Sequence, residues 1–237
     1  MLLSTNSGFR NPPLILEPYQ VVAFDAVSMT CDYIDHDYSE LLRNLELFAL
    51  EKYHETKPHK IFNHAWSFID NTYKLYGILK SLRISDEGDL LNSLLLTKPF
   101  RNTWQHIDSR IEYAKNHGLP LYGAISWYYK NHGVFQAISL QSGSLRASTE
   151  ITIDAYEYDQ DKIIQKIMFQ SFTRGKKAYN KRLNISLDSL YNEVAKIINF
   201  LSNQVDELPL SDELMKKKHV GFAQFRLDLE HVKPQSK

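Results

Sequence analysis

The sequence predicts a mainly helical α+β protein, in which a small antiparallel sheet is inserted between the helices. Two patterns predict this fold class. Across residues 24–48 apolar side chains recur at alternating steps of three and four, which indicates one buried helical stripe. From residue 121 onward the chain changes to runs of aromatic and β-branched residues separated by turn residues, which is typical of strands.

The 237 residues are expected to form a single domain, because this length allows one large domain with a substantial core. We place a four- to five-helix bundle in residues 19–116 and 186–204, and a β insertion in residues 121–170. Residues 205–237 are polar and contain a run of three lysines after Met215, so we expect a loosely held C-terminal tail.

Composition limits the function classes. The chain has 28 basic and 28 acidic residues and a pI near 7.1, so a nucleic acid would have to bind a local patch. The single cysteine, Cys31, excludes an internal disulfide and a zinc site built on cysteines, which favours a reducing compartment. Without a signal-peptide pattern or an apolar run of membrane-spanning length, we expect a cytoplasmic protein that does not insert into membranes.

Residues 1–18 contain one glycine and three prolines and are expected to form an irregular arm. The first helix follows from Phe24 as one long helix or two helices stacked end to end. The cluster Asp32, Asp35, His36 and Asp37 interrupts its stripe, and we interpret it as a solvated face or a helix break rather than a metal site.

The second helix is expected to begin near Pro58, which is tolerated in a first turn, and to run to Leu79. His54, His59 and His64 are spaced by five, so they do not share one helical face, and we expect surface histidines rather than metal ligands. A short third helix over residues 90–95 is expected to end by Thr97.

The segment Lys98–Glu112 is where the sequence suggests chemistry. Thr97 can cap a new helix and Pro99 can occupy its first turn, which leaves Arg101 and Asn102 near a helix N-terminus that favours phosphate. Asn102 and His106 are four apart and share a face. We expect the helix to continue with Ile107, Ile111 and Ala114 as its opposite, core-facing stripe.

Arg101-Asn102-Thr103-Trp104-Gln105-His106 resembles the motif of the HEPN superfamily, which is Arg, a polar residue, three variable residues and His. Composition alone predicts roughly 0.02 occurrences of Arg followed directly by Asn and, after three further residues, by His. The resemblance covers about residues 19–116, together with a returning helix near residues 186–204. It implies a four- or five-helix bundle that dimerises so that two motifs face each other and form one ribonuclease site without a metal. It implies His106 as general acid/base, Arg101 as the cation on the phosphate and Asn102 as the positioning amide.

Within the β insertion, two strand-like runs flank Asn131-His132-Gly133 and predict a hairpin. Residues 150–158 alternate like a third strand. Residues 162–170 suit either a fourth strand or a short helix. A last helix is expected after Ser186, which can cap it.

Residues 162–182 contain seven basic residues and no acidic residue. This stretch is either a solvated loop or a track for an RNA backbone. The candidate RNA contacts are Arg174, Lys176 and Lys177 from this stretch, together with Arg110 from the motif segment.

Two function classes follow. The first is a metal-independent endoribonuclease of toxin or phage-defence type, a homodimer with RNA as substrate and an antitoxin or nucleotidyltransferase as possible partner. The second is a non-catalytic helical module that binds a nucleotide or a partner protein. The sequence contains no Walker motif, kinase loop or Gly-x-Ser-x-Gly elbow, and we expect neither cofactor nor metal.

Overall fold

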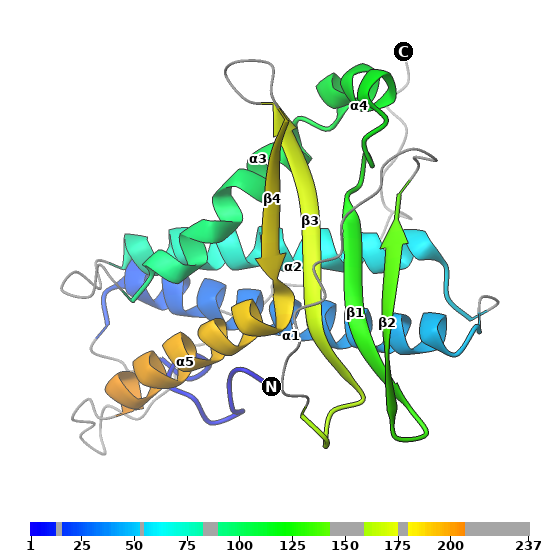
Figure 1. Ribbon diagram of the computed structural model, residues 1–237. Coiled ribbons are helices and arrows are strands. Elements are labelled where there is room, and N and C mark those ends of the chain that lie inside the picture. Colours follow the sequence, from blue (N-terminus) through cyan, green and yellow to red (C-terminus); the bar gives the residue numbers. More distant parts are fainter. Residues whose placement is uncertain (13–15, 53–54, 83–89, 143–158, 175–179, 207–237) are drawn as a thin grey trace, which may run out of the picture.

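The structure is a computed structural model that describes residues 1–12, 16–52, 55–82, 90–142, 159–174 and 180–206 (Figure 1). This part of the chain forms five α-helices, two short 3₁₀ helices and one four-stranded antiparallel sheet. In chain order the elements are α1 (Pro18–Ala49), α2 (Pro58–Ser81), a 3₁₀ helix (Asn92–Thr97), α3 (Lys98–Gln105), a second 3₁₀ helix (Asp108–Arg110), α4 (Ile111–His117), β1 (Ala124–Asn131), β2 (Val134–Gln141), β3 (Ile164–Arg174), β4 (Asn180–Ser186) and α5 (Leu187–Asp206). The predicted α+β class is confirmed.

α1 is one continuous helix of 32 residues. Pro18 occupies its first turn, and the side chain of Gln20 accepts a hydrogen bond from the backbone N–H of Glu17 at 2.9 Å, which satisfies a free donor at the helix start. Its predicted stripe is buried, with Val27, Ile34 and other apolar residues fully inaccessible to solvent.

The acidic cluster does not break α1, because its carboxylates have partners outside the helix. Asp32 binds the guanidinium of Arg10. Asp35 accepts hydrogen bonds from the backbone of Leu2 at 2.5 Å and from the hydroxyl of Tyr191 at 2.6 Å. The N-terminal arm is therefore held against α1 by these two carboxylates.

α2 packs along α1, and both helices run behind the sheet in Figure 1. Ile61, Ala65, Phe68 and Ile69 of α2 are buried in the contact. His64, expected at the surface, is instead largely buried and lies beside Asp37 of α1.

The sheet has the strand order β2-β1-β3-β4, with every neighbouring pair antiparallel. The predicted hairpin is confirmed: Asn131 pairs with Val134, and His132 and Gly133 both take the positive φ angles that two-residue hairpin turns require.

Residues 162–170, whose pattern suited either a strand or a short helix, belong mostly to β3. The strand predicted at residues 150–158 lies outside the described residues.

The core lies between the helix pair and one face of the sheet. Trp127 of β1 and Phe169 of β3 are buried in it, together with Trp66 of α2. α5 closes the structure next to α1 and β3 and contributes its own buried stripe. The stripe of α5 consists of Leu187, Leu190, Val194, Ile197, Ile198 and Leu201.

Candidate functional site

α3 carries the Arg-Asn-x3-His motif and is anchored on its inner side. Phe100 and Thr103 are buried, and the indole of Trp104 stacks on that of Trp66 with ring centroids 5.0 Å apart. Pro99 lies in the first turn, as predicted. The hydroxyl of Thr97 donates to the carbonyl of Leu94 at 2.5 Å, so it does not cap α3.

Arg101 is held by two residues of α2. Its Nε lies 3.3 Å from Oδ1 of Asp70, and the side chains are 30% and 24% exposed. Its guanidinium carbon lies 4.9 Å from the ring centroid of Tyr73, the distance of a cation–π contact. Asp70 also binds Nζ of Lys74 at 2.8 Å. The guanidinium therefore has a defined orientation at the edge of α3.

Asn102 and His106 are exposed on the outer side of α3. Their spacing of four residues places the two side chains on the same face. Within the part of the chain that the structure describes, neither side chain makes a hydrogen bond or ion pair with another residue. Both are consequently available to a ligand, whereas the guanidinium of Arg101 contacts α2.

The motif helix is shorter than predicted, because it ends at Gln105 with His106 as its C-cap. The N–H of Ile107 donates a hydrogen bond to the carbonyl of Trp104 at 3.2 Å. In a continuing α-helix it would donate to the carbonyl of Thr103. The guanidinium of Arg110 instead approaches the Thr103 carbonyl, with Nη1 at 3.4 Å. A basic side chain that satisfies a last-turn carbonyl is a known way to end a helix.

The prediction that Ile111 faces the core is therefore wrong, because Ile111 begins α4 and is 56% exposed. Ala114 is buried as expected. Arg110, a candidate RNA contact, is half-buried, and this burial lowers the pKa of its guanidinium. Its described hydrogen bond, to the carbonyl of Thr103, serves the end of α3.

The other three candidate RNA contacts are Arg174, Lys176 and Lys177. Arg174 ends β3, where its backbone pairs with Asn180. Lys176 and Lys177 lie outside the described residues.

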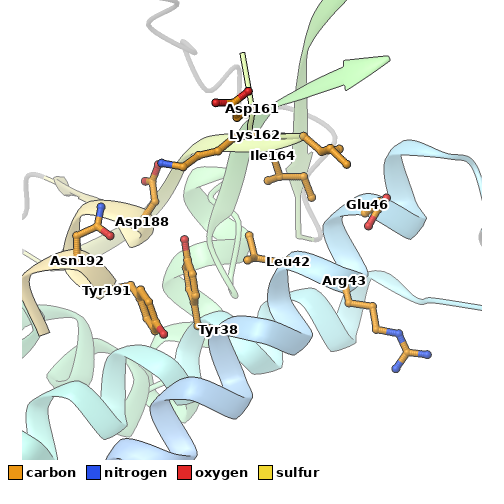
Figure 2. A pocket seen from close by; sticks show the side chains of 11 residues that line it. Tyr38, Leu42, Arg43, Glu46, Asp161, Lys162, Ile164, Asp188, Tyr191 and Asn192 are labelled. Carbon is orange, nitrogen blue, oxygen red and sulfur yellow. The ribbon is translucent and has the colours of Figure 1, made fainter. Parts of the chain in front are cut away.

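A second feature, missed by sequence reasoning, is a cavity of about 590 Å³ between α1, the start of β3 and the first turns of α5 (Figure 2). The ring of Tyr38 stacks on that of Tyr191 at its edge, with centroids 4.2 Å apart and planes within 11°. Both tyrosines fall on apolar helical stripes, so their pattern indicated core residues only. Asp188, in the first turn of α5, lies on the same wall.

The described residues contain no group of three or more His, Cys, Asp or Glu side chains placed to hold a metal ion. None of the helices formed by these residues is long and apolar enough to cross a bilayer. No family model, curated protein or solved structure matches this chain.

Proposed function

We propose that the protein is a metal-independent endoribonuclease that acts through Arg101, Asn102 and His106. The observation that carries the proposal is the arrangement on α3: the imidazole of His106 and the amide of Asn102 are exposed without protein partners in the described chain, and the same short helix carries the guanidinium of Arg101, which contacts Asp70. This is the set of groups that phosphodiester cleavage requires, namely a proton acceptor and a cation for the phosphate.

The proposed reaction begins when the neutral imidazole of His106 takes the proton from a ribose 2′-hydroxyl. The 2′-oxygen then attacks the adjacent phosphorus, and the bond from phosphorus to the 5′-oxygen of the next nucleotide breaks. An imidazolium returns a proton to this leaving oxygen. The products are a 2′,3′-cyclic phosphate and a 5′-hydroxyl end, so atoms and charge balance without an added reagent.

Arg101 stabilises the negative charge that develops on the phosphate oxygens. A guanidinium keeps its charge at cellular pH and offers several N–H donors in one plane. Its stack on Tyr73 and its contact with Asp70 fix that plane before RNA binds, which reduces the ordering needed in the transition state. Asn102 is proposed to position the phosphate or a ribose.

The proposed assembly is a cytoplasmic homodimer with a HEPN-like arrangement of helices. One motif supplies one base and one cation, whereas cleavage needs a base and a separate acid. Two α3 surfaces that face each other supply both. An antitoxin or nucleotidyltransferase that covers this surface is the proposed kind of regulating partner.

One observation favours a second candidate, a non-catalytic module that binds a nucleotide or a partner protein. Arg101 already has a carboxylate partner in Asp70. A guanidinium neutralised in this way binds phosphate less strongly than a free one. In this alternative the α3 surface recognises its ligand but transfers no proton.

The deciding experiment measures cleavage of labelled single-stranded RNA in excess chelator. We expect the wild-type protein to cleave and His106→Ala and Arg101→Ala to lose about 10²–10⁴ in rate, the usual cost of losing a general base or an equivalent group. The matched control is His59→Ala, since His59 is an exposed histidine of α2.

Circular dichroism verifies that all variants fold. A wild-type protein that cleaves no RNA, or a His106→Ala variant that cleaves at the wild-type rate, rejects the nuclease and leaves the binding module.

A further inference from the structure

The cavity beside Tyr38 is separate from the α3 surface and shares no residue with it. Its volume of about 590 Å³ lies within the roughly 300–1,000 Å³ typical of small-molecule sites. The walls combine apolar side chains, including Leu42 and Ile164, with charged residues from α1, from α5 and from the loop before β3. Figure 2 shows Leu42 between Asp188 on one side and Glu46 on the other.

The two cations of the lining are already engaged. Nζ of Lys162 lies 3.2 Å from a carboxylate oxygen of Asp159. Arg43 lies 3.5 Å from Glu40, and Figure 2 shows its guanidinium directed away from the centre of the cavity. Each cation therefore has a carboxylate partner, which reduces its attraction for an anion in the cavity.

The acidic groups of the lining are less completely satisfied. Asp188 accepts hydrogen bonds from the hydroxyl of Ser186 at 2.7 Å and from the backbone of Lys166 at 2.8 Å, which leaves lone pairs unused. Within the described chain, the carboxylates of Glu46 and Asp161 have no hydrogen-bond or ion-pair partner. The cavity therefore offers hydrogen-bond acceptors and negative charge.

Tyr38 adds a polar group inside the cavity. Its ring is fixed by the stack on Tyr191 and by a tilted contact with Phe68, with ring centroids 5.5 Å apart in the second contact. In the described part of the chain its hydroxyl makes no hydrogen bond, and Figure 2 shows this hydroxyl on the side of Asp188. The acceptor capacity of the phenol points into the space that a ligand would occupy.

We propose that this cavity binds a linear aliphatic diamine or polyamine. One ammonium group binds Asp188 and the hydroxyl of Tyr38, and the other binds Glu46. The methylene chain between them lies on Leu42 and Ile164. Two carboxylates on different elements, separated by apolar side chains, match two cations separated by methylenes, whereas a dianion of the same length meets repulsion at both ends.

The test is calorimetric titration of the full-length protein with 1,5-diaminopentane and with spermidine. Glutarate serves as a dianion of similar length, and n-pentylamine as a cation with one charge. We expect both amines with two or more charges to bind, n-pentylamine to bind roughly tenfold more weakly because one charged hydrogen bond is lost, and glutarate not to bind.

Variants place the binding in the cavity. Glu46→Gln and Tyr38→Phe are each expected to weaken diamine binding, Glu46→Gln by about tenfold. The matched control is Glu193→Gln, which removes the same charge from a carboxylate of α5 that binds Lys196 at 2.6 Å outside the cavity. Circular dichroism confirms folding.

The proposal is overturned if glutarate binds as tightly as the diamine, or if Glu46→Gln binds the diamine like the wild-type protein. An equal loss in Glu193→Gln assigns the binding to the general surface charge and also overturns it. RNA cleavage is not part of the readout, so failure here leaves the proposed nuclease untouched.

Discussion

Oδ1 of Asp37 on α1 lies 3.2 Å from Nδ1 of His64 on α2, and its other oxygen accepts a hydrogen bond from the side chain of Asn71 at 3.0 Å. The side chains of His64 and Asp37 are only 16% and 11% exposed. One carboxylate therefore satisfies two polar side chains at the contact between the two long helices.

We predict that Asp37→Ala destabilises the protein, because it removes the acceptor of the partly buried side chains of His64 and Asn71. The expected loss in the free energy of unfolding is about 1–3 kcal/mol, the usual cost of an unsatisfied buried group. Urea unfolding measures it. The control is Asp25→Ala, a half-exposed carboxylate of the same helix without a described partner, which should change stability by less than about 0.5 kcal/mol. Equal effects of the two variants would show that the network adds no stability.

The periodic parts of the fold could be predicted from the sequence. The stripe through Val27 and Leu45 predicted α1, because a helix that buries one face must repeat apolar residues at that spacing. The turn at His132 and Gly133 was predictable because positive φ angles restrict the residue types there.

Features set by contacts between distant residues could not be predicted. The sequence predicted a surface position for His64, because nothing in the pattern of α2 shows that Asp37 of α1 lies beside it. The motif helix ends at Gln105 through a contact from Arg110, not through a helix-breaking residue. The cavity needs three elements from separate parts of the chain, and the pattern of each element alone indicates core.

Two glycines should respond to alanine in opposite directions. Gly123 has φ +93°, and a Cβ there would lie 2.4 Å from the carbonyl oxygen of Gln170, a backbone atom that cannot move aside easily. We expect Gly123→Ala to cost about 1–3 kcal/mol. Gly77, inside α2, has no atom within 4 Å of its added Cβ, so Gly77→Ala should stabilise by about 0.5–1 kcal/mol.

Thermal and urea unfolding of the two variants in parallel measure the difference. A stabilised Gly123→Ala variant would mean that the approach between this turn and β3 is looser than the structure shows.

Stability should fall at alkaline pH through Tyr38 and Tyr191. Burial raises the pKa of the Tyr38 phenol, with further contributions from the charges of Asp188 and Tyr191. Burial and the hydrogen bond to Asp35 raise the pKa of Tyr191. The folded protein therefore keeps protons that the unfolded chain releases above about pH 10. The stabilisation is fully present below that pH and is lost as the pH rises toward the folded-state values.

Urea unfolding between about pH 8 and pH 11 should show this loss, together with an increase in phenolate absorbance on unfolding. Tyr38→Phe should flatten the decline, because it removes one of the responsible phenols and keeps the ring stack. The control is Tyr19→Phe at an exposed position of α1, which should leave the slope as it is. If the free energy of unfolding of Tyr38→Phe declines with pH as steeply as that of the wild-type protein, the Tyr38 phenol does not contribute to the decline.

The orientation of Arg101 provides the last prediction, which rests on the proposed nuclease. Arg101→Lys keeps a positive charge on α3 but loses the planar group that stacks on Tyr73 and faces Asp70. If charge alone served the reaction, this variant would cleave RNA nearly as well as the wild-type protein. We expect instead a loss of about 10²-fold in kcat, comparable to the effect of a misplaced catalytic group, with a smaller change in KM. Stability should change by less than about 1 kcal/mol, since the ion pair with Asp70 is partly exposed.

The matched control is Arg43→Lys, which should cleave normally. Arg43 is an exposed arginine of α1, and its described ion pair is with Glu40. A lysine variant with wild-type kcat would show that the contacts with Tyr73 and Asp70 serve packing alone, because the reaction would then need the charge of Arg101 but not its geometry.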